Sequence, residues 1–120
     1  MRYLSALARL PLLLGAASIA HAHALLDHAN PRVGSTVAAA PTELSLWFTQ
    51  KLEPAFSRVE VHDANGARVD DGRAQVDAAD ATLLRVALKP LPAGTYEVRW
   101  QVLSVDTHTT EGRFRFIVGE

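Results

Sequence analysis

The sequence contains no cysteine and only one methionine, and these two shortages limit the chemistry that the chain can support. Without cysteine the fold has no disulfide bond to hold it together, and no thiolate is available as a metal ligand. The single methionine is Met1, so no thioether lies further along the chain. Stability must therefore come from a packed apolar core, and any metal site must use nitrogen and oxygen ligands.

The chain also has no excess of positively charged side chains. The chain carries 12 Lys and Arg side chains against 13 Asp and Glu side chains, for a formal net charge of −1 at pH 7. Proteins that bind nucleic acid need a concentrated basic surface to neutralise phosphates. The composition therefore argues against a nucleic-acid partner.

The first 22 residues have the layout of a secretory signal peptide. Arg2 and Arg9 supply a short positive region, and residues 10–20 then run without a charge and end in small side chains. A membrane-spanning helix needs about 20 apolar residues, so this run is too short to anchor the chain. We therefore expect export to the periplasm and removal of the leader.

The junction reads Ala20-His21-Ala22-His23, and both candidate cleavage sites expose a histidine. The small-x-small pattern favours a cut after Ala22, which makes His23 the first residue of the mature chain. A cut after Ala20 would leave His21 at the front instead. With the favoured cut, removal of 22 of 120 residues leaves a single domain of 98 residues, 23–120, with a formal charge of about −3.

Alternating apolar and polar residues over most of the mature chain predict an all-β domain. Residues 91–98, LPAGTYEV, are similar to the tyrosine corner of immunoglobulin-like sandwiches. No stretch shows the spacing of an amphipathic helix. We predict a Greek-key β-sandwich of the immunoglobulin or fibronectin type III class with about seven strands. The clearest strands are expected over residues 43–49, 57–63, 83–88, 95–102 and 112–118.

Asp106 and His108 are the first candidates for a metal site. They are two residues apart, so in an extended chain both side chains point to the same face. On its own, the Asp-Thr-His stretch is more typical of an ordinary polar turn between strands. A mature chain that begins at His23 adds a second chelating group, because a free amine and an imidazole on one residue bind an ion in a closed ring.

Together, His23, Asp106 and His108 would supply three nitrogen ligands and one oxygen ligand. That set suits Cu(II), which also leads the divalent affinity series, and Zn(II) would bind the same ligands more weakly. Cu(I) prefers thiolate and thioether ligands, which the mature chain lacks. The sequence therefore predicts one Cu(II) ion per mature chain.

These features resemble the CopC family of periplasmic copper-binding proteins. The resemblance rests on the chain start at His23, the stretches LSLWFTQKLEP and LPAGTYEVRW, and the pattern W-x-x-x-S-x-D-T-H over residues 100–108. It implies a β-sandwich that binds Cu(II) through the amine and imidazole of His23, Asp106 and His108. It also implies a monomer with a role in copper resistance and homeostasis, and a CopD-type inner-membrane copper transport protein as a candidate partner.

The chain departs from many members of that family at a few positions. Many members carry a Met-rich Cu(I)-binding segment, but residues 55–66 contain no methionine here, so the chain resembles the Cu(II)-only branch. Gln50 stands where many relatives have a glutamate, and both Gln50 and His28 remain candidates for an additional contact with the metal. His62 is expected to be exposed on a strand, and Trp100 is expected to lie in the core.

Three classes of function fit the sequence. We favour a periplasmic copper carrier or buffer that is not an enzyme. The first alternative is an oxidative enzyme, because an N-terminal histidine chelate with a second imidazole also resembles the histidine brace of copper monooxygenases. Against it, Asp106 would occupy a position that oxygen needs, and 98 residues leave little room for a broad substrate surface. The second alternative is a metal-free interaction sandwich.

Overall fold

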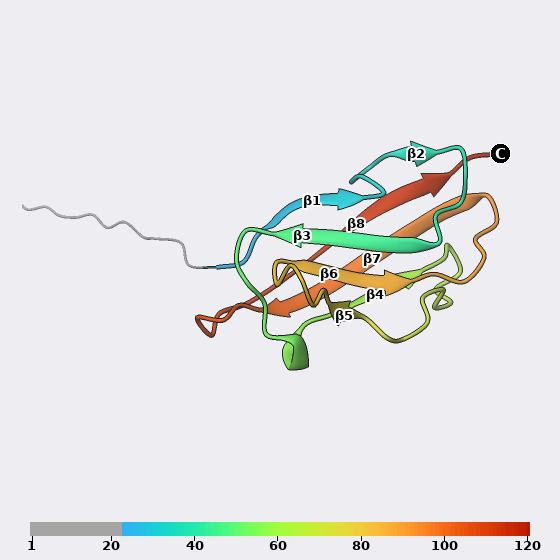
Figure 1. Ribbon diagram of the computed structural model, residues 1–120. Coiled ribbons are helices and arrows are strands. Elements are labelled where there is room, and N and C mark those ends of the chain that lie inside the picture. Colours follow the sequence, from blue (N-terminus) through green and yellow to red (C-terminus); the bar gives the residue numbers. More distant parts are fainter. Residues whose placement is uncertain (1–22) are drawn as a thin grey trace, which may run out of the picture.

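Two four-stranded β-sheets face each other in the computed structural model, which describes residues 23–120 (Figure 1). The expected leader, residues 1–22, lies outside the described residues. The first sheet has the order β1-β3-β6-β5, and its strands span Leu26–Asn30, Glu43–Phe48, Leu83–Ala87 and Gln75–Val76. The second sheet has the order β2-β8-β7-β4, and its strands span Thr36–Val37, Thr109–Val118, Gly94–Leu103 and Arg58–His62.

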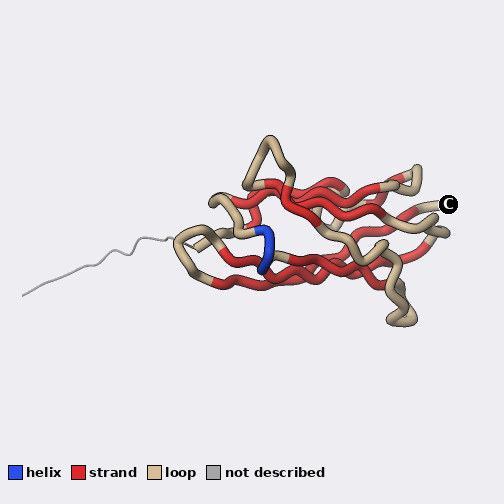
Figure 2. The backbone as a smooth tube through the Cα atoms, turned by 60° about the horizontal axis from the view of Figure 1, so that its bottom comes forward, coloured by secondary structure: helices blue, strands red, loops and turns tan. Residues whose placement is uncertain are grey.

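The remaining regular element is a short 3-10 helix, η1, at Pro54–Phe56. No helix among residues 23–120 is long and apolar enough to cross a membrane. Figure 2 shows the two sheets as separate layers, with η1 between strands β3 and β4 of the chain. The prediction of an all-β sandwich is confirmed.

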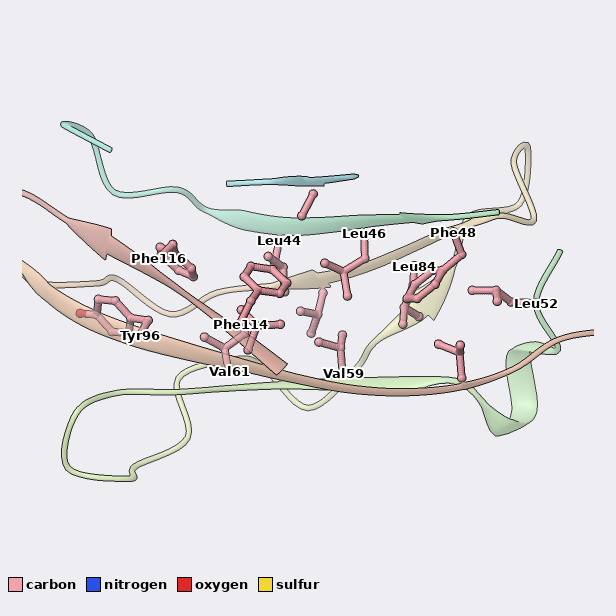
Figure 3. Packing of buried hydrophobic residues seen from close by; sticks show 14 of the residues in the cluster. Leu44, Leu46, Phe48, Leu52, Val59, Val61, Leu84, Tyr96, Phe114 and Phe116 are labelled. Atoms are coloured by element: carbon pink, nitrogen blue, oxygen red, sulfur yellow. The ribbon is translucent and has the colours of Figure 1, made fainter. Parts of the chain in front are cut away.

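The core fills the space between the sheets with side chains that alternate along each strand (Figure 3). Strand β4 buries Val59 and Val61 and turns its polar residues outward, as a period of two requires. Leu44 and Leu46 on β3 are both 0% exposed. Truncating one of these leucines to alanine costs about 2–5 kcal/mol, because the rigid layer cannot close over the missing atoms. The members of this alternating set are Leu44, Leu46, Phe48, Val59, Val61, Leu84, Val86, Tyr96, Val98, Val102, Phe114, Phe116 and Val118.

The tyrosine corner is present as predicted. The Tyr96 hydroxyl donates a hydrogen bond to the Pro92 carbonyl, and the Tyr96 ring stacks on Phe116 at 5.5 Å between centroids. Trp100 also meets its expectation, because it packs against the core and contacts Phe48 edge-on at 5.0 Å.

Two local expectations differ from the structure. There are eight strands rather than about seven, because β2 and β5 have only two residues each and are too short to show a period. His62 is not an exposed side chain, since only 13% of it is accessible. The backbone of Arg68 forms an isolated β-bridge with His62, and the imidazole Nε2 lies 3.3 Å from Glu60 Oε1. Its Nδ1 atom is buried without a hydrogen-bond partner among residues 23–120.

Three chain segments meet at one end of the sandwich, which we call the hairpin end (Figures 1 and 2). They are the start of the domain at 23–25, the connection at 49–53 after β3, and the β7–β8 hairpin at 103–109. Backbone hydrogen bonds join them: the amide of residue 49 donates to the carbonyl of residue 25 at 2.9 Å, and that of residue 105 to residue 51 at 3.0 Å. The hairpin end holds all three predicted metal ligands.

Candidate metal centre

The turn between β7 and β8 carries Asp106 and His108. It closes through two backbone hydrogen bonds, from the Ser104 amide to the His108 carbonyl at 3.0 Å and from the Thr107 amide to the Ser104 carbonyl at 2.8 Å. Thr107 has a φ of 73°, a left-handed conformation that reverses the chain. The segment is therefore the polar turn between strands that is typical of Asp-Thr-His, and not the extended stretch in which both side chains would share a face by alternation.

The turn nevertheless brings the two predicted ligands together. His108 Nδ1 lies 3.4 Å from Asp106 Oδ1, and both side chains remain partly exposed to solvent. A metal ion approaching from solvent meets an imidazole and a carboxylate side by side. Alternation along an extended strand would also place Asp106 and His108 together, but here the chain reversal at Thr107 does so.

Ser104 forms hydrogen bonds with both Asp106 and His108. Its side chain is 0% exposed, its hydroxyl donates to Asp106 Oδ1, and its oxygen accepts the His108 amide at 3.3 Å. The hydrogen bond from Ser104 lowers the pKa of the Asp106 carboxyl below its ordinary value, partial burial opposes this effect, and His108 adds to it. Asp106 is therefore ionised at neutral pH, which a carboxylate ligand requires.

His23 lies directly against His108. The two imidazole centroids are 4.5 Å apart, and the rings meet edge-on at 69°. The backbone after His23 is held in place, because Ala24 is 0% exposed and its carbonyl accepts a hydrogen bond from the Thr110 hydroxyl at 2.6 Å. The structure thus brings together His23, His108 and Asp106, which are up to 85 positions apart in the sequence.

The three side chains are neighbours without being arranged around a common point. Within residues 23–120, no group of three or more His, Asp or Glu side chains is already placed to hold a metal ion. In this chain the nitrogen of His23 is bonded to Ala22 as a peptide. The third nitrogen donor of the predicted set, the free amine of His23, would exist only in a chain that begins at His23.

The additional candidates have other contacts. The His28 ring stacks on Trp47 at 4.4 Å with an interplanar angle of 8°, and its Nδ1 lies 2.6 Å from Asp27 Oδ2. His62 pairs with Glu97 across β4 and β7, six positions before Leu103 at the hairpin end of β7. Gln50 lies half-buried in the 49–53 connection, and its side chain makes no hydrogen bond to the predicted ligands in the described part of the chain. Among residues 23–120, none of these three side chains forms a hydrogen bond or ring contact with His23, Asp106 or His108.

Comparison with known proteins gives one family and a consistent set of structures. A family model described as the CopC domain matches residues 26–119. The chain is 35% identical to CopC from Methylosinus trichosporium OB3b, whose crystal structure superposes with a TM-score of 0.76 over 81% of this chain and 94% of that chain. It is 33% identical to PcoC, a methionine rich copper resistance protein from Escherichia coli, with a TM-score of 0.69 over 81% of this chain and 99% of that chain.

A longer relative is also similar. The chain is 29% identical over 100 residues to the copper transport protein CutJ of Bacillus subtilis (strain 168). The match covers 82% of this chain but spans only 18% of the length of CutJ.

Proposed function

The chain belongs to the CopC family, and from this premise we propose that its mature form is a periplasmic protein that binds one Cu(II) ion and passes it on. The observation that carries the proposal is the contact of His23 with His108 at 4.5 Å, together with the pairing of His108 and Asp106 at 3.4 Å. Two imidazoles, one carboxylate and one free amine form the nitrogen and oxygen set that Cu(II) favours.

The proposed oxidation state follows from the missing sulfur ligands. PcoC is described as methionine rich, whereas this chain has no methionine after Met1 and no cysteine. Because Cu(I) favours thioether and thiolate ligands, we expect tight binding of Cu(II) and no comparably tight site for Cu(I). Competition titrations with chelators for each oxidation state test this, and tight Cu(I) binding by the mature protein would contradict it.

We propose that removal of residues 1–22 completes the site. The folded domain begins immediately after His23, because Ala24 is fully buried and the Leu25 amide donates to Thr49 Oγ1 at 2.9 Å. A cut after Ala22 therefore frees an amine on a residue that already touches His108. A cut after Ala20 would leave the His23 nitrogen inside a peptide bond.

The experiment compares Cu(II) affinity for the exported chain with that of a leaderless chain carrying one extra Met before His23. Both should unfold at the same temperature, since no core contact depends on the amine. Cu(II) affinity should fall by orders of magnitude in the extended chain, where each tenfold loss equals about 1.4 kcal/mol. Equal affinities would show that processing does not build the site. Mass spectrometry of the exported protein identifies its first residue.

We propose transport rather than catalysis as the role of the bound ion. Asp106 adds a third side-chain ligand beside the histidines, which leaves less open coordination for oxygen than a site of two histidines alone. Oxygen consumption by the Cu(II)-loaded protein with a reductant tests the alternative of a histidine-brace enzyme. Consumption above that of free copper, lost on replacing His108, would support the enzyme.

A copper transport protein of the inner membrane, of the CopD type, is the partner that we propose. The support is that a segment similar to this chain forms part of a much longer copper transport protein in Bacillus subtilis. Three of the exposed large apolar side chains, Leu25, Phe56 and Val105, also lie at or beside the hairpin end, where an acceptor must approach the ion. Phe56→Ser should slow transfer of Cu(II) to such a protein in vesicles, whereas Val33→Ser should not, because Val33 belongs to the segment beside Arg115, far along β8.

A further inference from the structure

The two residues that follow His23 are tied to both sheets of the sandwich. From β8, the Thr110 hydroxyl donates to the Ala24 carbonyl at 2.6 Å. From the end of β3, Thr49 Oγ1 accepts the Leu25 amide, and the Thr49 amide donates to the Leu25 carbonyl, both at 2.9 Å. The Ala24 side chain between these hydrogen bonds is 0% exposed.

This attachment is unusual for the start of a domain. Strand β1 begins at Leu26, so residues 24 and 25 lie ahead of the first regular strand pairing. The first residues of a domain are usually poorly ordered unless something ties them down. Here a buried methyl group and three hydrogen bonds fix the backbone up to the residue next to His23.

Thr110 also connects the backbone next to His23 with the strand that follows His108. It lies on β8 two positions after His108, and β8 continues directly from the turn that carries Asp106. A single hydrogen bond therefore connects the backbone beside His23 to the strand that presents His108. Loss of that bond would loosen the backbone next to His23 without removing any ligand, while the two hydrogen bonds between Leu25 and Thr49 remain.

We infer that Thr110 is a positioning residue of the metal centre: its hydroxyl holds the Ala24 carbonyl so that the amine and imidazole of His23 stay beside His108 before copper binds. The inference rests on the proposed function, because it concerns the geometry of the Cu(II) ligands. Holding a ligand in its bound position in the metal-free protein removes an ordering cost from the binding step. Affinity should therefore depend on a side chain that never touches the ion.

The test uses Thr110→Val, expressed as the full chain, exported, and checked by mass spectrometry for a first residue at His23. Valine keeps the shape and the strand preference of threonine and removes only the hydrogen bond. We expect Cu(II) affinity, measured by chelator competition, to fall about tenfold, which corresponds to about 1.4 kcal/mol. Thr110→Ser keeps the hydroxyl and should restore most of the affinity.

The matched control is Thr109→Val. Thr109 is adjacent on the same strand, is exposed, and its hydroxyl makes no hydrogen bond among residues 23–120. This variant should bind Cu(II) like the wild type. A loss of similar size in both valine variants would overturn the inference, because it would show a general effect on β8.

A second background separates positioning from a purely structural role. In the leaderless chain with an extra Met before His23, the free amine belongs to the added Met and no longer to His23, the residue next to Ala24. Thr110→Val should therefore lower Cu(II) affinity much less in this chain than in the mature chain. An equal loss in both backgrounds overturns the inference. Wild-type binding that is tight, with Thr110→Val equally tight, also overturns it and leaves the proposed function intact. Absence of tight Cu(II) binding by the wild type overturns the proposed function and the inference together.

Discussion

Replacing the buried carboxylate of Asp70 by an amide should destabilise the domain strongly. The Asp70 side chain is 0% exposed and lies where the chain crosses between the sheets. Its Oδ1 accepts the Val61 amide at 2.8 Å and Arg68 Nε at 3.0 Å, and its Oδ2 accepts the Gly72 amide at 2.9 Å. The carboxylate thus satisfies two backbone donors and one cationic side chain.

Asp70→Asn retains one oxygen and turns an NH2 group toward the donors that the other oxygen served. One backbone hydrogen bond is lost outright, and the rest lose their charged acceptor. Hydrogen bonds to charged groups contribute about 1.5–3 kcal/mol each, so we expect the free energy of unfolding to fall by about 2–4 kcal/mol at pH 7. With a urea dependence of about 1–3 kcal/mol per molar, the midpoint of unfolding should drop by about 1–2 M.

The loss should depend on pH in a defined direction. Burial raises the pKa of Asp70, but hydrogen bonds from Arg68 and from the Val61 and Gly72 amides outweigh it, so the pKa lies below its ordinary value. A lowered pKa means that the folded state gains stability from the ionised carboxylate above about pH 4, and loses it as pH falls through the folded pKa. The difference between wild type and Asp70→Asn should therefore shrink in acid.

Urea unfolding at several pH values tests both statements. The control is Asp71→Asn, since Asp71 is exposed and caps a turn by accepting the Arg73 amide at 2.9 Å. This control should change the free energy of unfolding by much less. A change below about 1 kcal/mol for Asp70→Asn, or a loss that stays constant from pH 7 to pH 3, would refute the assignment of Asp70 as a stabilising carboxylate.

Three further outcomes follow from the structure. His108→Ala should weaken Cu(II) binding more than about 100-fold, because replacing even a residue that only supports a metal ligand lowers metal affinity about 10–100-fold. His62→Ala should leave the Cu(II) affinity unchanged in the same chelator competition. Cu(II) affinity should fall steadily from pH 8 to pH 5, because protons compete for the amine and imidazole nitrogens, and a flat titration would contradict imidazole ligation. Gly112→Ala should lower the thermal midpoint by an amount equivalent to about 1–3 kcal/mol, because the added Cβ would lie 2.5 Å from Trp100 Cζ2 and force the packed ring to move. The control is Gly119→Ala, whose added Cβ would have its nearest contact at 3.5 Å, and this variant should unfold like the wild type.

Local sequence patterns were sufficient to predict the sandwich. Alternation of apolar residues identifies the long strands, since a strand with one buried face imposes a period of two. The strands β2 and β5 escape that reasoning because two residues show no period. His62 alternates as an outward residue should, yet its side chain is largely covered and its backbone bridges to Arg68, which the strand pattern does not reveal.

The sequence pointed to three residues that the structure places side by side, but not to the geometry that brings them together. Asp106 and His108 meet because Thr107 adopts a left-handed conformation, which the letters Asp-Thr-His do not reveal. The contact between Thr110 and Ala24 joins residues 86 positions apart. No local pattern encodes such a contact, because it depends on how the finished sheets place β8 against the chain start.

The Asp70 network and the predicted metal ligands lie in different parts of the sandwich. Asp70 bonds to Val61, which pairs with Val98 near the middle of β7, whereas the predicted ligands Asp106 and His108 follow Leu103 at the end of that strand. A weakened Asp70 network lowers the free energy of unfolding without moving the β7–β8 turn. In native conditions Asp70→Asn should therefore bind Cu(II) with wild-type affinity, while Thr110→Val should show the reverse pattern of near-normal stability and weakened binding. If both variants instead lost stability and Cu(II) affinity together, the site would be coupled to global stability. The hydrogen bond from Thr110 to the Ala24 carbonyl would then not be what organises the site.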